Sequence, residues 1–459
     1  MQEQDLAAQR KLFGTNGIRG TIGKDMTAQF AMEMGRAIGS FFQGDVVIGT
    51  DARTSNEMLK SAVAAGVLSA GCGVIDIGLA PTPSVQYSVA KSSACAGVII
   101  TASHNPPEFN GIKVIDSDGI ELDFSKELEI EKIYFSKNFR GADWHSTGSL
   151  RKDDSANSKY VEGIKGAVDS KTIRKAKLKI IIDCANGVAG LVTPGLLADL
   201  GVEVKALNER PDGSFPAHPS EPTPENLKQL MQAVSAEGAS FGVAHDGDAD
   251  RSIFVDEKGR YVTGDRSFAL LAGYIVSKNP GSSVVSTVAT SDCVADMVAR
   301  NGGKTVLTRV GSPVIAKKMK EIGAVFGGEE SGGLFYAKHQ YCKDAAMTTA
   351  LMAQMVAEKG QMSKLLAEVP VYHQTKLKVK CPKERMSEVM AKMTVASKGK
   401  KVDLTDGVKV FEGKDWVIIR PSGTEPIFRI FSQSSSEERA GALAKGYLAK
   451  LEKIINGSS

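Results

Sequence analysis

Residues 46–77 read VVIGTDARTSNEMLKSAVAAGVLSAGCGVIDI, and this stretch decides the fold class. The apolar run Val46–Gly49 predicts a buried strand, and the loop Thr50–Ser55 follows it. Apolar residues then recur at helical spacing over residues 58–67, which predicts an amphipathic helix. That helix ends at Gly71, and Val74–Ile77 predicts a second strand. A strand, a helix and a strand in this order are typical of an α/β domain with a largely parallel sheet.

The same strand–helix–strand pattern returns twice along the chain. The second copy is Ile180–Asp183, Leu191–Leu200 and Val202–Leu207, and the third is Val284–Val288, Cys293–Asn301 and Thr305–Thr308. Ligands of parallel sheets bind where loops leave the carboxyl ends of strands. Three related α/β domains, each offering a loop to a shared cleft, are therefore expected. One long doubly wound domain is the alternative, but 459 residues favour several domains.

The last 90 or so residues follow a different pattern. Trp416–Arg420 and Ile427–Phe431 predict paired strands around a Pro/Gly loop, and Ser436–Ile455 predicts a closing helix. Two strands and a helix indicate a small α+β domain. Polar or Pro-containing seams near residues 155, 256 and 369 divide the chain into four expected domains, at 1–155, 156–256, 257–368 and 369–459.

Composition narrows the class of protein. With 42% hydrophobic and 24% charged residues, the chain is typical of a globular protein, and no apolar run is long enough to span a membrane. A net charge of +4 gives no reason to expect nucleic acid as a partner. The six cysteines show neither disulfide nor zinc spacing, and Met1–Arg10 lacks the apolar stretch of a secretory signal. A cytoplasmic protein is expected.

The first chemical motif is AGVIITASHNPPEFNGIK, residues 96–113. Val98–Ile100 predicts a buried strand that delivers Ser103 to a loop at its carboxyl end. Asn105 and the following prolines stop the chain from continuing as a helix. A serine held in this way is suited to act as a nucleophile or phosphoryl carrier. A lone serine in a turn more often only bonds nearby backbone groups, so this alternative stays open.

The second motif is FGVAHDGDADR, residues 241–251. Asp246, Asp248 and Asp250 alternate after an apolar strand, so their carboxylates can converge on one hard divalent cation. An EF-hand loop is one alternative, because Glu257 falls at the twelfth position. Arg251, however, takes the place of the turn glycine, and a strand precedes the loop. Magnesium on a phosphoryl-transfer loop is preferred, and a solvated acidic turn is the remaining alternative.

Two further loops carry polar side chains. GGEESGG, residues 327–333, is a glycine-rich loop whose Glu329 and Ser331 suit the hydroxyl groups of a sugar. RPSGTEPIFR, residues 420–429, combines Arg420, Ser422 and Thr424 with a Gly turn, a pattern that suits an anion such as phosphate. A hairpin turn with incidental polar residues explains the second loop equally well.

Together with FGTNGIRG at residues 13–20, these motifs resemble the α-D-phosphohexomutase superfamily, in the same order and over nearly the whole chain. The resemblance implies four domains around a central cleft. The first three are expected to be related mixed-sheet α/β domains. The last is expected to have a TATA-binding-protein-like α+β fold.

The resemblance also implies roles for individual residues. Ser103 would carry the phosphoryl group and complete the metal site of the three aspartates. Lys113, Arg19 and Arg251 would be positive groups near the transferring phosphate, and the glycine-rich loop would contact sugar hydroxyls. The site for the phosphate that does not react would comprise Arg420, Ser422, Gly423, Thr424 and Arg429.

The implied activity is the interconversion of hexose 6-phosphate and hexose 1-phosphate through a phosphoserine. Mg²⁺ and a hexose 1,6-bisphosphate would take part, the partner would be a small sugar phosphate, and a homo-oligomer is compatible with the family. Many bacterial members carry His where this chain has Gly333, and the GGEESGG form is closer to archaeal-type members. Glucosamine phosphate is therefore the preferred substrate, with mannose and glucose phosphates as alternatives. A magnesium-dependent sugar-phosphate phosphatase and a non-catalytic calcium- or sugar-phosphate-binding protein are more remote.

Overall fold

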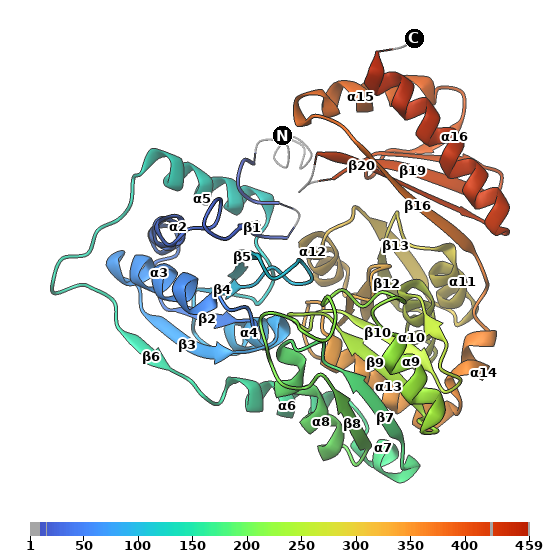
Figure 1. The fold of residues 1–459 in the computed structure, drawn as a ribbon, viewed down its shortest axis with the longest axis horizontal. Coiled ribbons are helices and arrows are strands. Elements are labelled where there is room, and N and C mark those ends of the chain that lie inside the picture. Colours follow the sequence, from blue (N-terminus) through green and yellow to red (C-terminus); the bar gives the residue numbers. More distant parts are fainter. Residues whose placement is uncertain (1–9, 15, 423–425, 458–459) are drawn as a thin grey trace.

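The structure, a computed structural model, describes residues 10–14, 16–422 and 426–457. Its strands form separate sheets in four successive parts of the chain, called here the first to fourth domains. Figure 1 shows the first domain in blue on the left and the fourth in orange and red at the upper right, with the other two below and between. The expected fold class, three mixed-sheet α/β domains followed by an α+β domain, is confirmed.

The first domain has a six-stranded sheet with the order β1-β5-β4-β2-β3-β6. Its strands are β1 (Ile18–Thr21), β2 (Val46–Thr50), β3 (Val74–Leu79), β4 (Ala96–Ile100), β5 (Phe109–Asp116) and β6 (Leu150–Lys152). Its helices are α2 (Ala28–Phe41), α3 (Asn56–Ser69), α4 (Thr82–Ala90) and α5 (Phe124–Ser136). Ile48 and Val47 pack into different apolar cores on the two faces, which explains the unbroken apolar run of β2.

The second sheet has the order β11-β10-β9-β7-β8. Its strands are β7 (Lys179–Asp183), β8 (Glu203–Leu207), β9 (Phe241–His245), β10 (Ser252–Asp256) and β11 (Tyr261–Val262). The accompanying helices are α6 (Ala156–Ala167), α7 (Ser170–Ala176), the 3₁₀ turn η1 (Val188–Leu191), α8 (Thr193–Asp199) and α9 (Lys228–Ala236). Ile182 and Ile181 again point into different cores, so this sheet is also covered on both faces.

The third sheet has the order β13-β12-β14-β15. Its strands are β12 (Ser283–Thr287), β13 (Lys304–Thr308), β14 (Phe326–Gly328) and β15 (Leu334–Tyr336). Its helices are α10 (Gly264–Lys278), α11 (Asp292–Arg300), α12 (Ser312–Ile322), α13 (Ala345–Lys359) and α14 (Met362–Ala367). A single apolar core continues from the second domain into the third, which ties these two domains together.

One topological rule positions the three N-terminal motifs. In each of the first three domains, the first strand of the strand–helix–strand pattern (β2, β7 or β12) pairs with a parallel strand on each side. One of these two neighbours then pairs with the next strand of the chain in antiparallel orientation. These antiparallel pairs are β4–β5, β9–β10 and β14–β15. The Ser103, aspartate and glycine-rich motifs occupy the three connections within these pairs. The motifs are therefore equivalent loops of three related domains.

The fourth sheet has the order β16-β20-β19-β18-β17 and is wholly antiparallel. Its strands are β16 (His373–Lys380), β17 (Lys401–Asp403), β18 (Val408–Glu412), β19 (Asp415–Pro421) and β20 (Ile427–Ser434), and its helices are α15 (Lys383–Ala396) and α16 (Glu437–Asn456). The predicted pairing of residues 416–420 with residues 427–431 is confirmed, but the sheet has three strands that the sequence pattern did not reveal.

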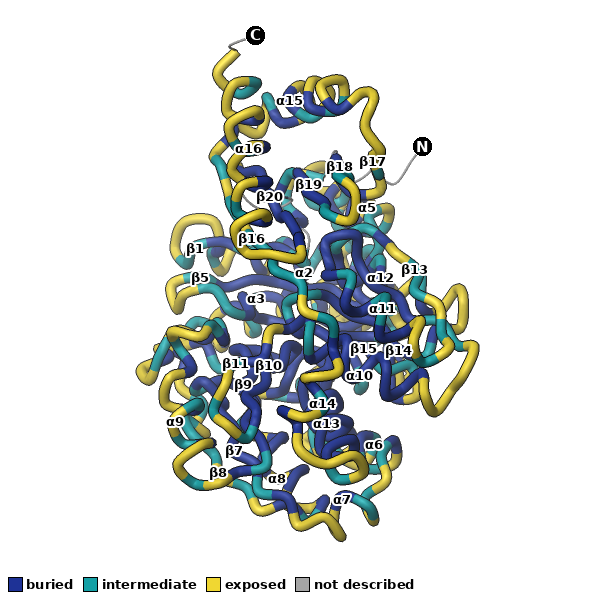
Figure 2. Tube along the Cα trace, turned by 90° about the vertical axis from the view of Figure 1, so that its right-hand side faces the viewer, coloured by how far each residue is buried: buried dark blue, intermediate teal, exposed yellow. Residues whose placement is uncertain are grey.

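The fourth domain docks on the third through one face of its sheet. Val417 and Ile419 face the core shared with α15 and α16, whereas Trp416 and Ile418 pack against Val288 and Ala289 of the third domain. Figure 2 shows the central strands buried, with exposed residues along the outer turns of α16 and the peripheral loops. Within the described residues, no helix is long and apolar enough to cross a membrane.

Candidate active site

Ser103 lies in the connection between β4 and β5, called here the serine loop (residues 101–108). Its backbone has a φ of 53°, in the left-handed region that residues other than glycine rarely adopt. The backbone N–H of Ser103 donates to Thr101 Oγ1 at 2.8 Å, which helps to fix this turn. Strained residues of this kind cluster at functional sites, where the surroundings hold them in place.

Arg53, which lies outside all the sequence motifs, anchors the serine loop. Its guanidinium donates to the carbonyl oxygens of Ser103 at 2.8 Å, Pro106 at 2.6 Å and Phe109 at 2.8 Å. The Arg53 Nε lies 3.2 Å from Asp51 Oδ2, and both side chains are fully buried. One buried cation therefore holds the serine loop against the end of β2. The only sequence signal for Arg53 was its position directly after that strand, in residues 51–55 (DARTS).

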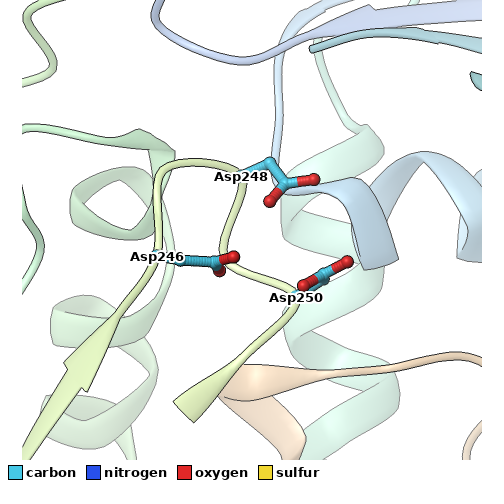
Figure 3. Close-up of side chains that lie close together, drawn as sticks. All are labelled: Asp246, Asp248 and Asp250. Carbon is cyan, nitrogen blue, oxygen red and sulfur yellow. The ribbon is translucent and has the colours of Figure 1, made fainter. Parts of the chain in front are cut away.

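Asp246, Asp248 and Asp250, the aspartate triplet, lie on the connection between β9 and β10. One carboxylate oxygen from each lies within 4.8 Å of those of the other two, and all three residues are buried. Figure 3 shows their side chains projecting from this single loop toward a common region. Gly247 lets the loop approach the serine loop, because a Cβ there would lie 2.6 Å from the Ser103 carbonyl oxygen.

The structure brings Ser103 to the aspartate triplet. Ser103 Oγ donates to Asp246 Oδ2 at 3.0 Å, and His104 Nδ1 lies 3.3 Å from the same Oγ. The second domain also bonds directly to the first, since Thr82 donates to Asp248 through both its backbone N–H, at 2.9 Å, and its side chain, at 2.8 Å. The serine and the triplet therefore form one site across two domains.

Cations bind the outer oxygens of the triplet. Lys113 Nζ lies 2.8 Å from Asp248 Oδ2 and 3.5 Å from Asp250 Oδ2. Lys343 Nζ lies 3.1 Å from Asp250 Oδ2, and Arg251 Nε lies 2.8 Å from Asp246 Oδ2. Each carboxylate thus has one oxygen turned toward a positive donor.

The inner oxygens of the triplet fit a metal ion. Asp248 Oδ1 and Asp250 Oδ1 are buried and accept no hydrogen bond from the described residues. A buried carboxylate oxygen without a partner is costly, and a hard divalent cation bound by oxygen ligands removes that cost. The residues present could therefore hold such an ion between Asp246 and these two oxygens, although Asp250 Oδ1 also lies 3.8 Å from Arg251 Nε.

The charges of the triplet are unevenly balanced. Burial raises the pKa of Asp246 above its usual range, although the adjacent Arg251 opposes that change. Burial acts in the same direction on Asp248, but the ammonium of Lys113 outweighs it and the pKa of Asp248 is lowered. The charge of Asp246 is thus less well compensated than that of Asp248.

Arg19 and Arg251 both lie close to the serine loop. Arg19 donates from Nη1 to Asn105 Oδ1 at 2.7 Å. Arg251 makes two hydrogen bonds of 3.0 Å to Glu221, a carboxylate outside every sequence motif. Burial and the nearby Arg251 lower the pKa of His104 to about 2, so its imidazole is neutral at neutral pH.

The glycine-rich loop faces the same region from the third domain. Glu329 is nearly buried, and its Oε1 accepts the backbone N–H of Gly311 at 3.1 Å. Ser331 lines a cavity of about 540 Å³ that Arg251 and Glu221 also line. The cavity extends from the loop that carries the aspartate triplet (the metal loop, residues 246–251) along the glycine-rich loop to the segment that joins the third and fourth domains.

Arg420 and Arg429 face each other on β19 and β20, the strands of the arginine hairpin (residues 420–429). Arg420 Nε lies 2.9 Å from Asp406 Oδ2, which also accepts the backbone N–H of Val310 at 3.1 Å. Ser422 closes the hairpin by donating its backbone N–H to Ile427 O at 2.9 Å. Asp406 thus joins the hairpin to the third domain, next to Gly311 and Glu329. Gly423 and Thr424 lie outside the described residues.

The EF-hand alternative does not fit the geometry. Glu257, its twelfth-position ligand, follows β10 and accepts the backbone N–H of Ser363 at 3.0 Å. The carboxylate of Glu257 is thus engaged with α14. A strand on each side of the triplet also replaces the helices of an EF-hand.

Comparison with known proteins agrees with this geometry. Residues 10–141, 158–259, 263–372 and 376–449 match, in order, the three alpha/beta/alpha domains and the C-terminal domain of the phosphoglucomutase/phosphomannomutase family. A phosphoglucomutase/phosphomannomutase of Thermococcus kodakarensis is 43% identical over 97% of this chain and 100% of its own length. A probable phosphoglucosamine mutase of Methanopyrus kandleri is 41% identical over 97% of this chain and 98% of its own.

Solved structures give the same result. A family member from Burkholderia thailandensis has a TM-score of 0.85 and 29% identity, over 97% of each chain. A putative phosphomannomutase from Thermus thermophilus has a TM-score of 0.82 and 27% identity, over 95% of this chain and 98% of its own. The family expected from the motifs is confirmed, and with it the phosphohexomutase reaction class. This chain belongs to the phosphoglucomutase/phosphomannomutase family.

Proposed function

We propose that this protein interconverts hexose 6-phosphate and hexose 1-phosphate through phosphorylated Ser103, with Mg²⁺ at the aspartate triplet. The observation that carries this proposal is the 3.0 Å contact between Ser103 Oγ and Asp246 Oδ2. A phosphoryl carrier beside a cation site is what such a transfer requires, because its catalysis is mostly positioning and charge stabilisation. The cytoplasm is the proposed location, since all six cysteines are free thiols.

In the first transfer, a free hydroxyl of the hexose monophosphate attacks the phosphorus of phosphoserine 103. The new O–P bond forms as the bond from phosphorus to Ser103 Oγ breaks. The proton that the sugar hydroxyl loses balances the proton that the serine oxygen gains. A hexose 1,6-bisphosphate results, turns around without leaving the cleft, and returns its other phosphoryl group to Ser103.

Positive groups around Ser103 stabilise the charge that spreads over the transferring oxygens. Lys113 enters on β5, Arg19 on β1, and Arg251 directly after the triplet. Bound Mg²⁺ would act as a Lewis acid on the same oxygens. Because Glu221 and Asp246 both bind Arg251, its guanidinium is oriented before substrate arrives.

The remaining residues hold the substrate. Glu329 and Ser331 would bind the sugar hydroxyls, and the hairpin residues Arg420, Ser422, Gly423, Thr424 and Arg429 would bind the phosphate that does not react. Holding this second phosphate decides which sugar oxygen faces Ser103. Asp406, which binds Arg420 and the backbone next to Gly311, supports a fixed spacing between the two subsites.

Glucosamine phosphate is the proposed substrate. One relative at 41% identity is named a probable phosphoglucosamine mutase, and one at 40% identity is named a phosphoglucosamine/phosphogalactosamine mutase. The test compares kcat/KM for glucosamine, mannose and glucose 1-phosphates, each with a trace of the matching bisphosphate. The highest value is expected for glucosamine 1-phosphate. A higher value for mannose or glucose 1-phosphate would contradict the substrate assignment. Steady release of inorganic phosphate would indicate a phosphatase, and binding without turnover a non-catalytic protein.

A further inference from the structure

Lys343 places a buried ammonium group in the site, although it belongs to none of the sequence motifs. It lies in the segment between β15 and α13, and its Nζ is 3.1 Å from Asp250 Oδ2. Its charge also interacts with the carboxylates of Glu329 and Glu121. Lys343 therefore stands between the aspartate triplet and the glycine-rich loop, the two elements that would bind the cation and the sugar.

The stem of Lys343 occupies the space above Gly333, the last residue of the glycine-rich loop. A Cβ at position 333 would lie 2.3 Å from Lys343 Cδ and 2.9 Å from Lys343 Cγ. Gly333 is not among the glycines with a positive φ, so its backbone conformation does not require glycine. Position 333 requires glycine because a larger residue would overlap the stem of Lys343.

The chain around Lys343 is firmly anchored. The next residue, Asp344, caps α13 by accepting the backbone N–H of Met347 at 2.9 Å. Its carboxylate also accepts Gln340 Nε2 at 2.8 Å and the hydroxyl of Tyr160. The backbone N–H of Asp344 donates to Leu334 O at 3.0 Å, which ties the segment to β15. A lysine on so rigid a support presents its ammonium at a fixed point.

Asp250 shows what this ammonium does. Asp250 Oδ2 receives both Lys343, at 3.1 Å, and Lys113, at 3.5 Å, whereas Asp250 Oδ1 accepts no hydrogen bond from the described residues. Two ammonium groups beside Asp250 Oδ2 fix the rotation of the carboxylate. Its other oxygen, whose ion-pair partner Arg251 Nε is 3.8 Å away, is left for the cation. A group that orients a ligand in this way acts on the site without touching the ion.

We propose that Lys343 is a positioning residue of the phosphoryl-transfer site, and that Gly333 is glycine because the lysine stem must cross it. The ammonium turns Asp250 Oδ1 toward the cation and links the metal loop to the glycine-rich loop. The measurement of kcat for Lys343 rests on the proposed mutase function. The claim that Gly333 leaves space for the Lys343 stem concerns only the folded protein and does not depend on that function.

The test of the charge is Lys343→Met, which keeps the stem but removes the ammonium. The expected result is a kcat about 10- to 100-fold lower, with a KM for the sugar phosphate within about threefold of the wild type. Lys338→Met, a lysine of the same segment that bonds only Ala167 O among the described residues, is the matched control and should keep its kcat. In Lys343→Ala, propylammonium should restore kcat with rising concentration, whereas propanol should not. Unchanged kcat in Lys343→Met would overturn the positioning role.

The test of the space is a double-mutant cycle at positions 333 and 343, read as melting temperature of the metal-free protein and as kcat. Gly333→Ala should lower both in the wild-type background, because the added methyl overlaps the lysine stem. In the Lys343→Ala background the same methyl should cause no further loss. Equal losses in both backgrounds would overturn the spatial claim. A wild-type protein without mutase activity would instead overturn the proposed function, while the melting temperatures would still decide the spatial claim.

Discussion

Ser103 Oγ lies 3.0 Å from Asp246 Oδ2, although the two residues are 143 positions apart. Each lies in the loop that follows a strand of a different sheet, and Gly247 lacks the side chain that would keep the two loops apart. This approach turns a serine turn and an acidic turn, each ordinary alone, into one site with a nucleophilic oxygen and a place for a cation.

Removal of the cation should be visible in stability as well as in activity. Mg²⁺ at a hundred times its dissociation constant should stabilise the wild type by about 2.7 kcal/mol, if it binds only the folded state. Asp250→Asn should abolish most of the Mg²⁺-induced rise in melting temperature, whereas the exposed Asp212→Asn should keep it. A full rise in Asp250→Asn would contradict the assigned metal site.

Arg53 should matter for folding because it is the cation that pairs with the buried Asp51 carboxylate and bonds the serine loop at the same time. Arg53→Met leaves the buried Asp51 carboxylate without its cation, and such losses destabilise proteins by about 3–5 kcal/mol. The free energy of unfolding from urea titration measures this. Arg151→Met, which breaks an exposed pair with Asp45, is the control and should have little effect. Similar stabilities of the two variants would disprove the anchoring role.

Arg420 should affect substrate binding more than turnover. Arg420→Ala removes a charged hydrogen bond to the second phosphate, which costs about 1.5–3 kcal/mol. The expected KM is about 10- to 150-fold higher, measured in a coupled mutase assay. Arg439→Ala alters another arginine of the fourth domain, paired with Glu412 and Asp415, and should leave KM as it is. An unchanged KM in Arg420→Ala would count against the phosphate role.

Asp265 should make stability depend on pH. Burial raises the pKa of Asp265 to about 7, although Lys376 opposes this and Glu330 and Asp292 add to it. A carboxyl with a raised pKa contributes stability that is complete below its unfolded pKa, about 4, and is lost as the pH rises through about 7. The uncharged variant Asp265→Asn keeps an acceptor for the backbone N–H of Ser291.

The stability of Asp265→Asn relative to wild type should therefore increase by about 2–3 kcal/mol between pH 5 and pH 8. Urea unfolding of the metal-free proteins at both pH values measures the difference. The exposed Asp154→Asn is the control and should show no comparable change. A constant difference between Asp265→Asn and wild type would show that Asp265 does not titrate in this range.

The sequence predicted the elements that depend on neighbouring residues. Val98–Ile100 and residues 241–245 are short apolar runs before polar loops, and each is a buried strand that ends at the motif. By contrast, β16 was not predicted: its first three residues, His373 to Thr375, are all polar, and the alternation of lysines with apolar residues covers only residues 376–380 of this edge strand. An alternation that short is a weaker signal than one that runs through the whole strand.

The supporting residues of the site could not be predicted in the same way. Lys343, Glu221 and Arg53 stand outside recognisable motifs, and their partners are distant in the sequence. Arg53 meets the Ser103 carbonyl 50 positions away, and Glu221 meets Arg251 30 positions away. Such pairs arise from how distant segments of a domain pack together, which single-sequence patterns do not encode.

The most direct test measures the intact mass of the protein after incubation with a hexose 1,6-bisphosphate and Mg²⁺, followed by peptide mapping. One phosphoryl group on Ser103 is expected in the wild type, and neither phosphoryl group nor mutase activity in Ser103→Ala. A Ser103→Ala protein that still interconverts the sugar phosphates, or a wild type phosphorylated only at another residue, would contradict the account.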